Sequence, residues 1–475
     1  MKKIFVRFWN RFAICFFTVL FLFVSLFIVG MAAEPEYENR LFDVDHVHQI
    51  DIRIAEEDLE DLLADPVGKM KYHADIIIDG EEFKDVSFST KGNSSLYFVA
   101  ADGDSSRYSF RIKFDKFVED QTYHGLDMLS LNNSFHDATH LKDYFSYEIF
   151  RQAGVPAPLL SHVWLTINGK DHGLYYAVED EKESFLDREF GGEGVIYKPE
   201  SKDANLKADQ IEDIKNNGLS MEEIHGADLI YIDDSPESYP DIFDNAETKA
   251  GKQDAEVVIE AMKSLAEGTD LSSCLNTDEI IRFFAAHNFV LDYDSYTGTY
   301  LHNLVLYAGN DRVALIPWDY NLSFGTFTHV VGEEALSDAT DILDRGIDSP
   351  LIGVFEDSRP MWKWIVQDDN YRREYHDAMD ALVAAYFESG QFDRDFQTMY
   401  ELLHPYVEKD PTAFYTVDEF ERGCEVLQQF GVRRAESVRK QLEGELSSYS
   451  EDQNDQEKVD ASDLTLMDMG ASFFD

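Results

Sequence analysis

The sequence predicts an α+β protein in which a β-rich N-terminal part with one prominent helix precedes a mostly helical C-terminal part. Between residues 46 and 178, short segments alternate apolar and polar residues, as strands with one buried face do. Residues 140–153 and much of 257–442 instead repeat apolar residues at helical spacing. We therefore expect a bilobal chain with a β-rich lobe at 34–180 and a helical lobe at 181–445.

Turn residues mark the strands of the N-terminal part. Asp79-Gly80 separates two alternating runs, and Asn168-Gly169 separates two more, so each pair is expected to form a hairpin. Residues 50–54 and 108–114 also alternate. The expected helix at 140–153 stops at Gly154, with prolines just beyond it.

The C-terminal part is interrupted by polar stretches. Residues 200–255 are acidic and are interpreted as a partly ordered surface insertion. Helices are expected at 257–265 and 278–289, followed by a hairpin at 304–316 and further helices from 361 to 442. Residues 446–475 are rich in acids and contain one Lys, which predicts a disordered tail.

Residues 1–33 have the character of an export segment. Lysines and arginines up to Arg11 precede an apolar run at 12–29, and Gly30-Met31-Ala32 resembles a cleavage site. An uncleaved anchor is the alternative, because about 18 apolar residues can just span a bilayer. We expect a secreted or cell-surface protein, attached to the membrane only if this segment is retained.

Composition excludes several classes of protein. The chain has 475 residues, and 41 Lys+Arg against 93 Asp+Glu give a net charge of −52. Such a charge argues against nucleic-acid binding, which needs clustered cations. No C-x-x-C pair occurs, so a zinc ribbon or dithiol site is not expected. A Cys274–Cys424 disulfide is allowed after export, but two buried free thiols are the preferred interpretation.

The densest polar group surrounds the hairpin at 304–316. Asp292, Asp294, His302 and Asn303 precede it, and Asp319 follows it directly. Because a hairpin returns its end to near its beginning, Asn303 and Asp319 should be neighbours, with Asp294 close by. Carboxylate and amide oxygens are the ligands of hard divalent cations. Each aspartate alone could equally cap a turn or a helix.

A second candidate is the segment Lys91-Gly92-Asn93-Ser94, which follows an expected strand. A small, polar segment can offer backbone N–H groups and hydroxyls to phosphates. It lacks the spacing of a P-loop, and an ordinary loop is the alternative.

A third candidate is a cation–carboxylate pair. Lys113 and Arg111 share one face of a strand, and that face could also be solvent. Glu148 shares an apolar helical stripe with Leu141 and Phe145, so its carboxylate is predicted to be buried and to need a cationic partner. Lys113 is the expected partner.

The resulting order is strand lysine, helix glutamate, catalytic-type aspartate and metal-type aspartate, which is the order found in protein kinases. No H-R-D, D-F-G or A-P-E string occurs, so a standard protein kinase is excluded.

The chain resembles the CotH spore-coat kinase family, an atypical branch of the protein-kinase-like fold. The resemblance covers roughly residues 40–445 and is carried by the strings KGNSS, SFRIKFDK, LKDYFSYEIFRQAGVPAP, GLYYAVED, DSYTGTYLHNLVLY and PWDYNLSFG.

This resemblance implies a bilobal kinase-like fold and phosphorylation of Ser/Thr in protein substrates, with ATP and Mg²⁺ or Mn²⁺. It implies that Asp294 in D-S-Y is the catalytic residue and that Asp319 in P-W-D binds metal. Lys113 and Glu148 would form the nucleotide-binding pair, with Lys91 as a rival phosphate contact. Asn303 stands farther from Asp294 than the kinase asparagine does from its aspartate, which weakens its assignment as a second metal ligand.

Two other functions compete with an active exported kinase. One is a non-catalytic surface or adhesion protein on the same scaffold, and the other is a different phosphoryl or nucleotidyl transferase, because a fold does not fix a function. The joint presence of Lys113, Glu148, Asp294 and Asp319 favours an enzyme.

Overall fold

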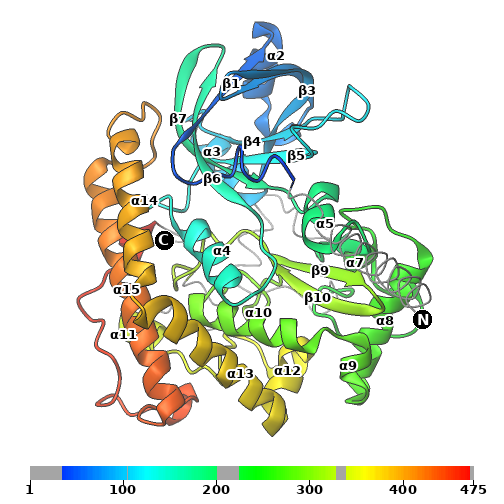
Figure 1. The fold of residues 1–475 in the computed structure, drawn as a ribbon, viewed down its shortest axis with the longest axis vertical. Coiled ribbons are helices and arrows are strands. Elements are labelled where there is room, and N and C mark those ends of the chain that lie inside the picture. The colour runs from blue at the N-terminus through cyan, green and yellow to red at the C-terminus, as the bar shows by residue number, and fades with distance from the viewer. Residues whose placement is uncertain (1–34, 104, 201–223, 328–337, 471–475) are drawn as a thin grey trace, which may run out of the picture.

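A computed structural model describes residues 35–103, 105–200, 224–327 and 338–470 of the chain. The N-terminal β-structure lies on one side of the molecule, and helices with a small sheet form the other (Figure 1). The mixed α+β class predicted from the alternating and helical patterns is confirmed.

Seven strands form a closed barrel in the order β1-β2-β3-β4-β5-β7-β6, with β1 parallel to β6. Their side chains alternate between the barrel interior and its outside, and an apolar core fills the interior. The strands are β1 His48–Ile54, β2 Tyr72–Ile78, β3 Glu81–Lys91, β4 Ser109–Lys113, β5 Met128–Asn132, β6 Leu160–Ile167 and β7 Lys170–Glu179. Both hairpins predicted from Asp79-Gly80 and Asn168-Gly169 are present.

Short helices border this barrel. They are α2 Glu56–Ala64, the 3₁₀ turn η1 Pro66–Gly68, α3 Ser94–Asp102 and α4 Lys142–Gln152. The helix predicted at 140–153 corresponds to α4, which packs on the central helix of the C-terminal part.

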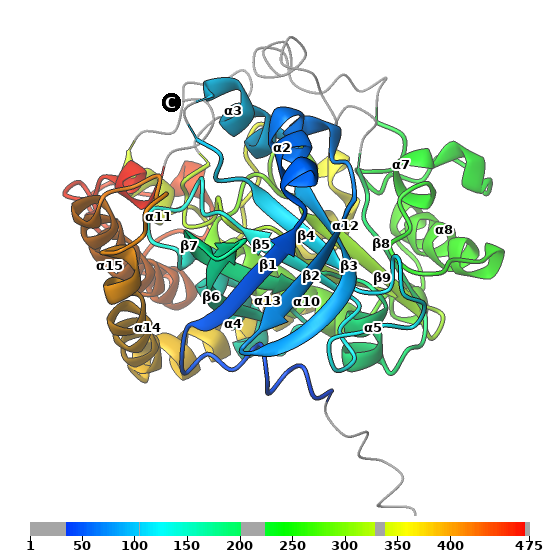
Figure 2. The same cartoon turned by 90° about the horizontal axis from the view of Figure 1, so that it is seen from above.

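The C-terminal part contains a three-stranded sheet of order β10-β9-β8, built from β8 Val195–Tyr197, β9 Leu304–Gly309 and β10 Arg312–Pro317. Helix α10, Thr277–Val290, packs against α4, β10 and α13, and most of its residues are buried. Seen from above, the barrel strands overlie α10 and α13, with α14 and α15 at one side and α8 at the other (Figure 2).

The remaining helices belong to the C-terminal part. They are α5 Glu183–Phe190, α7 Pro240–Phe243, α8 Lys252–Glu267, α9 Leu271–Cys274, α11 Ala339–Leu343, α12 Pro360–Gln367, α13 Asp369–Leu382, the π-turn η5 Val383–Glu388, α14 Gln391–Val407 and α15 Val417–Glu443. Shorter 3₁₀ turns are η3 Pro236–Ser238, η4 Glu356–Ser358, η6 Ser450–Asp452 and η7 Leu466–Met469.

A buried arginine joins the barrel to the C-terminal part. Arg107, just before β4, donates to both carboxylate oxygens of Asp410, at 2.9 and 3.1 Å, and to the hydroxyl of Thr412 at 2.8 Å. Both charged side chains are 1% exposed. Gly173 permits this approach, because its φ is +104° and a Cβ there would lie 2.0 Å from the Asp410 carboxylate.

The prediction of a disordered acidic tail is wrong for residues 446–470. Apolar side chains recur between the acids and are buried against the C-terminal helices, and η7 packs on α15. These buried residues are Leu446, Val459, Ala461, Leu464, Leu466 and Met469. Burial of this apolar set outweighs the local charge.

Other sequence predictions have mixed outcomes. Cys274 and Cys424 are buried and free, as preferred. The predicted insertion at 200–255 is described only from residue 224, where Leu229 and Tyr239 are buried. The predicted export segment lies outside the described residues. Within the described ranges, no helix combines the length and the apolar character needed to cross a membrane.

Candidate functional site

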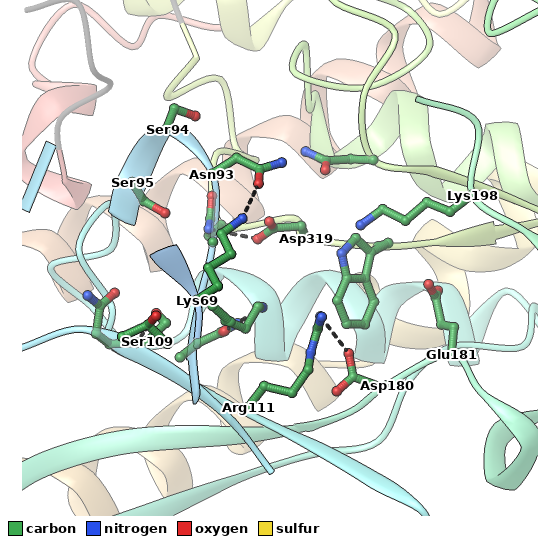
Figure 3. Close-up of a pocket in the computed structure, with 18 of the residues that line it drawn as sticks. Lys69, Asn93, Ser94, Ser95, Ser109, Arg111, Asp180, Glu181, Lys198 and Asp319 are labelled. Carbon is green, nitrogen blue, oxygen red and sulfur yellow. Dashed lines mark hydrogen bonds and ion pairs between the residues drawn. The ribbon is translucent and has the colours of Figure 1, made fainter. Parts of the chain in front are cut away.

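A pocket of about 500 Å³ lies where the barrel meets the C-terminal part. Its barrel side is built by β3, β4 and the end of β7, together with the loop that begins α3. Its other side is built by the segments that follow α10 and β10 (Figure 3). The hairpin of β9 and β10 brings these last two segments together, as the sequence predicted.

The pocket is much less acidic than the chain. Seven cationic and six acidic side chains line it, whereas the chain has 41 Lys+Arg and 93 Asp+Glu. The cations are Lys69, Lys71, Lys91, Arg111, Lys113, Lys182 and Lys198. The acids are Asp180, Glu181, Glu200, Glu247, Asp294 and Asp319. A local concentration of cations in an acidic protein favours an anionic ligand.

Lys91 stands at the end of β3, on the inner side of the pocket. Its Nζ donates to Asn132 Oδ1 at 2.8 Å and lies 5.3 Å from the ring centroid of Trp318. Lys198 Nζ lies over the same ring at 5.1 Å. Burial lowers the pKa of Lys91, although the charges of Asp319 and Asp180 act in the opposite direction. An anionic ligand would stabilise the charged ammonium of Lys91 as these two carboxylates do.

The segment that follows Lys91 leads directly into α3. Gly92 has a φ of +107°, and Asn93 stands immediately before the first residue of the helix, Ser94. Lys69 Nζ donates to Asn93 Oδ1 at 2.8 Å. The predicted residues Lys91, Gly92, Asn93 and Ser94 therefore all line one pocket, with a cation and a helix start beside them.

Asp294 and Asn303 are hydrogen-bonded to each other. Asn303 Nδ2 donates to Asp294 Oδ2 at 3.1 Å. Burial, and then the negative charge of Asp319, raises the pKa of Asp294 to about 8. A carboxyl with such a pKa can exchange a proton near neutral pH.

Asp319 follows β10, and hydrogen bonds to its backbone and to its side chain hold it in place. Its N–H donates to the Tyr147 hydroxyl at 3.0 Å, and Asn321 Nδ2 donates to its Oδ1 at 2.8 Å. Its φ is +57° and that of Asn303 is +56°, values that Asp and Asn tolerate better than most residues do.

Asp292 does not line the pocket but lies beneath the Asp294 loop. It is fully buried, and its Oδ1 accepts the backbone N–H of Asp294 at 2.9 Å. Burial, and then the charge of Asp294, raises the pKa of Asp292 well above its ordinary value. Of the two candidate aspartates, Asp294 is the one that faces the pocket.

The predicted pair of Lys113 and Glu148 is not formed, and that prediction is wrong. Lys113 lines the pocket, but its Nζ lies 3.4 Å from Asp115. Glu148 pairs with Arg151 at 3.3 Å and accepts from Gln152 at 2.7 Å, away from the pocket lining. The helix face that contacts the Asp319 segment carries Asp143 and Tyr147, and Glu148 faces elsewhere because successive helical residues point about 100° apart.

Sequence reasoning missed two carboxylates beside the pocket. Asp180, directly after β7, is 3% exposed and pairs with Arg111 at 3.2 Å. Glu181 is buried, and its Oε1 has no hydrogen-bond partner among the described residues. The signal that could have found them is the run of three acids from Glu179 to Glu181, which directly follows the apolar stretch 174–178.

Buried His287 connects the loops that carry Asp294 and Asp319, and buried Arg359 holds the first of these loops. His287 of α10 places Nδ1 2.8 Å from the Tyr320 hydroxyl and Nε2 2.8 Å from the Thr297 hydroxyl. Arg359 donates to the carbonyls of Tyr296 and Gly298, both at 2.6 Å. These contacts fix the two loops relative to α10 and α12.

Comparisons with known proteins identify the family of the chain. The model of the family described as CotH kinase protein matches residues 88–438, which include Lys91, Asp294 and Asp319. The chain is also similar to the inner spore coat protein H of Bacillus subtilis (strain 168). The two are 21% identical over 341 residues, which cover 71% of this chain and 84% of that protein.

Proposed function

The chain belongs to the CotH kinase protein family, and on this premise we propose that it transfers the γ-phosphoryl group of ATP to Ser or Thr of a protein substrate. The observation that carries the proposal is the convergence of Lys91, Asp294 and Asp319 on one cation-rich pocket of a strongly acidic chain. Phosphoryl transfer requires such a combination of phosphate-binding cations and paired carboxylates.

The phosphate side of the site is assigned to the barrel. Lys91, and the start of α3 at Gly92, Asn93 and Ser94, would bind the phosphates of ATP. Lys69 and Arg111 lie close enough to add charge, since both line the same pocket. Lys113 is retained as a weaker contact, because it faces Asp115.

The metal side is assigned to Asp319 and Asn303. Oxygen ligands suit Mg²⁺ or Mn²⁺, and Mg²⁺ is usually held by only one or two carboxylates together with substrate phosphates and water. Asn303 uses its Nδ2 toward Asp294, so its Oδ1 is the atom that could face a metal. When bound, the ion supplies positive charge that neutralises the transferring phosphate.

Asp294 is assigned to the acceptor hydroxyl. A carboxylate here can orient the Ser or Thr hydroxyl and accept its proton as the new P–O bond forms. Burial and Asp319 raise its pKa to about 8, which makes it a stronger base than an ordinary aspartate. The backbone bond to Asp292 and the amide of Asn303 hold it in place.

The proposal extends to fold and location. The barrel and the helical part correspond to the two lobes of an atypical protein-kinase-like fold, with the pocket between them. The similarity to a spore coat protein, together with the export-type segment at 1–33, supports a secreted or cell-surface location. Membrane attachment would depend on that segment alone.

The proposal is tested by incubating the purified full chain with labelled ATP, Mg²⁺ or Mn²⁺ and a generic protein acceptor. We expect phosphate transfer to Ser or Thr that is lost in Asp319→Ala and reduced roughly 10²–10⁴-fold in Asp294→Asn, the usual share of a positioned acid–base group. Asp311→Asn is the matched control, because Asp311 is an exposed turn residue of the same hairpin.

Two outcomes would contradict the proposal. Folded protein that binds no ATP and transfers no phosphate would favour the non-catalytic surface protein. Transfer that is equal in the parent and in Asp319→Ala would place the chemistry elsewhere.

A further inference from the structure

A second polar cluster lies on the barrel, away from the pocket. It consists of His46, His48 and Asp79, each of which offers one ligand atom, and these atoms lie within 4.8 Å of one another. His48 begins β1, and Asp79 stands in the turn between β2 and β3. None of the three lines the pocket, and all precede the segment that the family model matches.

The hydrogen bonds of His48 define where its proton lies. Its Nε2 is 2.8 Å from the backbone carbonyl of Asp43, which can only accept, so Nε2 carries a hydrogen. Its Nδ1 is 2.6 Å from Oδ2 of Asp79. In the neutral ring Nδ1 then carries a lone pair instead of a hydrogen. This lone pair would face a carboxylate oxygen, and the two would repel each other. A positive species is therefore needed at this contact: a second proton fits the observed 2.6 Å separation, and a metal ion fits once the two atoms move apart.

The surroundings fit a metal ion. Metal-bound histidines usually donate the other ring N–H to a backbone carbonyl or carboxylate, as His48 does to Asp43. The ring of His46 lies 4.1 Å from that of His48, centroid to centroid, and its side chain is 54% exposed, so it can reorient toward an ion. Asp79 also accepts the backbone N–H of Gln49 at 2.9 Å, which fixes its carboxylate.

We propose that His46, His48 and Asp79 bind a zinc-type divalent metal ion, with water as a fourth ligand. Two imidazoles and one carboxylate suit Zn²⁺ and similar transition metals better than Mg²⁺ or Ca²⁺, which prefer all-oxygen sites. Tetrahedral bonds of about 2.0 Å place ligand atoms roughly 3.3 Å apart, so His48 Nδ1 and Asp79 Oδ2 would separate slightly on binding.

Such an ion would join two segments at one end of the barrel. It would connect the chain entering β1 to the turn between β2 and β3, and β1 is also the strand that closes the barrel against β6. The expected effect is on stability rather than on phosphate transfer, because binding to the folded state alone raises the free energy of unfolding.

The test measures Zn²⁺ binding to the tag-free full chain by calorimetry, with Co²⁺ absorption as a report of tetrahedral geometry. We expect one Zn²⁺ per chain at this cluster and a higher thermal midpoint with Zn²⁺. His46→Ala and Asp79→Asn should each weaken binding by at least about 10-fold, since even outer-shell partners of a metal are worth that much. Both should fold, because His46 is exposed and Asn tolerates the φ of +47° at position 79.

Two variants control for other sites. His73→Ala removes an exposed histidine that pairs with Asp85 and stacks on Phe117, and it should leave Zn²⁺ affinity unchanged. Asp319→Ala should also leave it unchanged, which separates this cluster from the pocket. The proposal is overturned if the parent binds no Zn²⁺, which would leave a proton between His48 and Asp79. It is equally overturned if binding survives His46→Ala and Asp79→Asn or is lost in Asp319→Ala.

Discussion

Asp143 accepts a hydrogen bond from the backbone N–H of Tyr320 at 2.6 Å and so joins helix α4 to the residue directly after Asp319. Its other carboxylate oxygen accepts the hydroxyl of Tyr176 at 2.6 Å. Burial, and then the charge of Asp319, raises the pKa of Asp143 to about 7. The helix carboxylate that supports the pocket is thus Asp143 rather than Glu148.

Asp143→Ala should therefore impair the site. The methyl group accepts from neither donor, so the backbone N–H of Tyr320 beside Asp319 loses a contact worth about 1–3 kcal/mol, or roughly 10–100-fold in Mg-ATP affinity if that loop must be fixed to bind. Calorimetric titration with Mg-ATP checks this. Glu148→Gln is the control on the same helix and should bind normally, while equal losses in both variants would show that α4 is merely destabilised.

Asp294 should make the protein less stable as pH rises. Its pKa is raised from 3.8 to about 8 in the folded state, so between these values the folded protein holds a proton that the unfolded chain has released. The free energy of unfolding therefore falls as pH rises through this window. Asp294→Asn lacks this proton, and its thermal midpoint should exceed that of the parent by an amount that grows from pH 5 to pH 8.

The same thermal unfolding measurements, repeated with Mg²⁺, also test whether a metal ion binds beside Asp294. Saturating Mg²⁺ should reduce the difference between Asp294→Asn and the parent at pH 8, because a cation beside Asp319 offsets the repulsion. Asp311→Asn should follow the parent at every pH. A midpoint difference that does not vary with pH would contradict the assigned cause.

Lys91 should matter more for nucleotide binding than Lys113. Lys91 is largely enclosed and lies beside Asn132 and Trp318, whereas the Lys113 side chain is 33% exposed and faces Asp115. Charged hydrogen bonds contribute about 1.5–3 kcal/mol, so Lys91→Met should raise the Kd for Mg-ATP by roughly 10–100-fold. Lys113→Met should change it by less than about 3-fold, and the reverse ranking would restore Lys113 as the principal phosphate contact.

Removal of residues 446–475 should destabilise the fold. The tail buries Leu446, Val459, Leu464 and Met469, and each such side chain contributes about 1.5–3 kcal/mol. Thermal unfolding should show a clearly lower midpoint than that of the full chain. Removal of 471–475 alone is the control and should have little effect, and an unchanged midpoint after the longer deletion would show that the tail is dispensable.

Local turn chemistry made much of the fold predictable. Asp79-Gly80 and Asn168-Gly169 marked two hairpins of the barrel, and the hairpin at 304–316 correctly placed Asn303 and Asp319 in one pocket. Barrel closure was not predictable, because the parallel pairing of β1 with β6 joins residues more than a hundred positions apart.

The errors have physical reasons as well. Glu148 shares an apolar stripe with Phe145, but a stripe does not say which neighbour covers it, and the pocket lies toward Asp143 and Tyr147. The tail was predicted to be disordered from its charge, although Leu464, Leu466 and Met469 supply enough apolar surface to anchor it. Asp180 was missed because its partner, Arg111, comes from a distant strand.

The link between Arg107 and Asp410 also constrains the order of events during synthesis. The two residues are 303 positions apart, so the ribosome releases all the strands of the barrel long before the carboxylate that Arg107 requires. Until then a buried guanidinium lacks its counter-ion, which is costly. The nascent barrel therefore acquires its final charge pairing only when the last quarter of the chain is available.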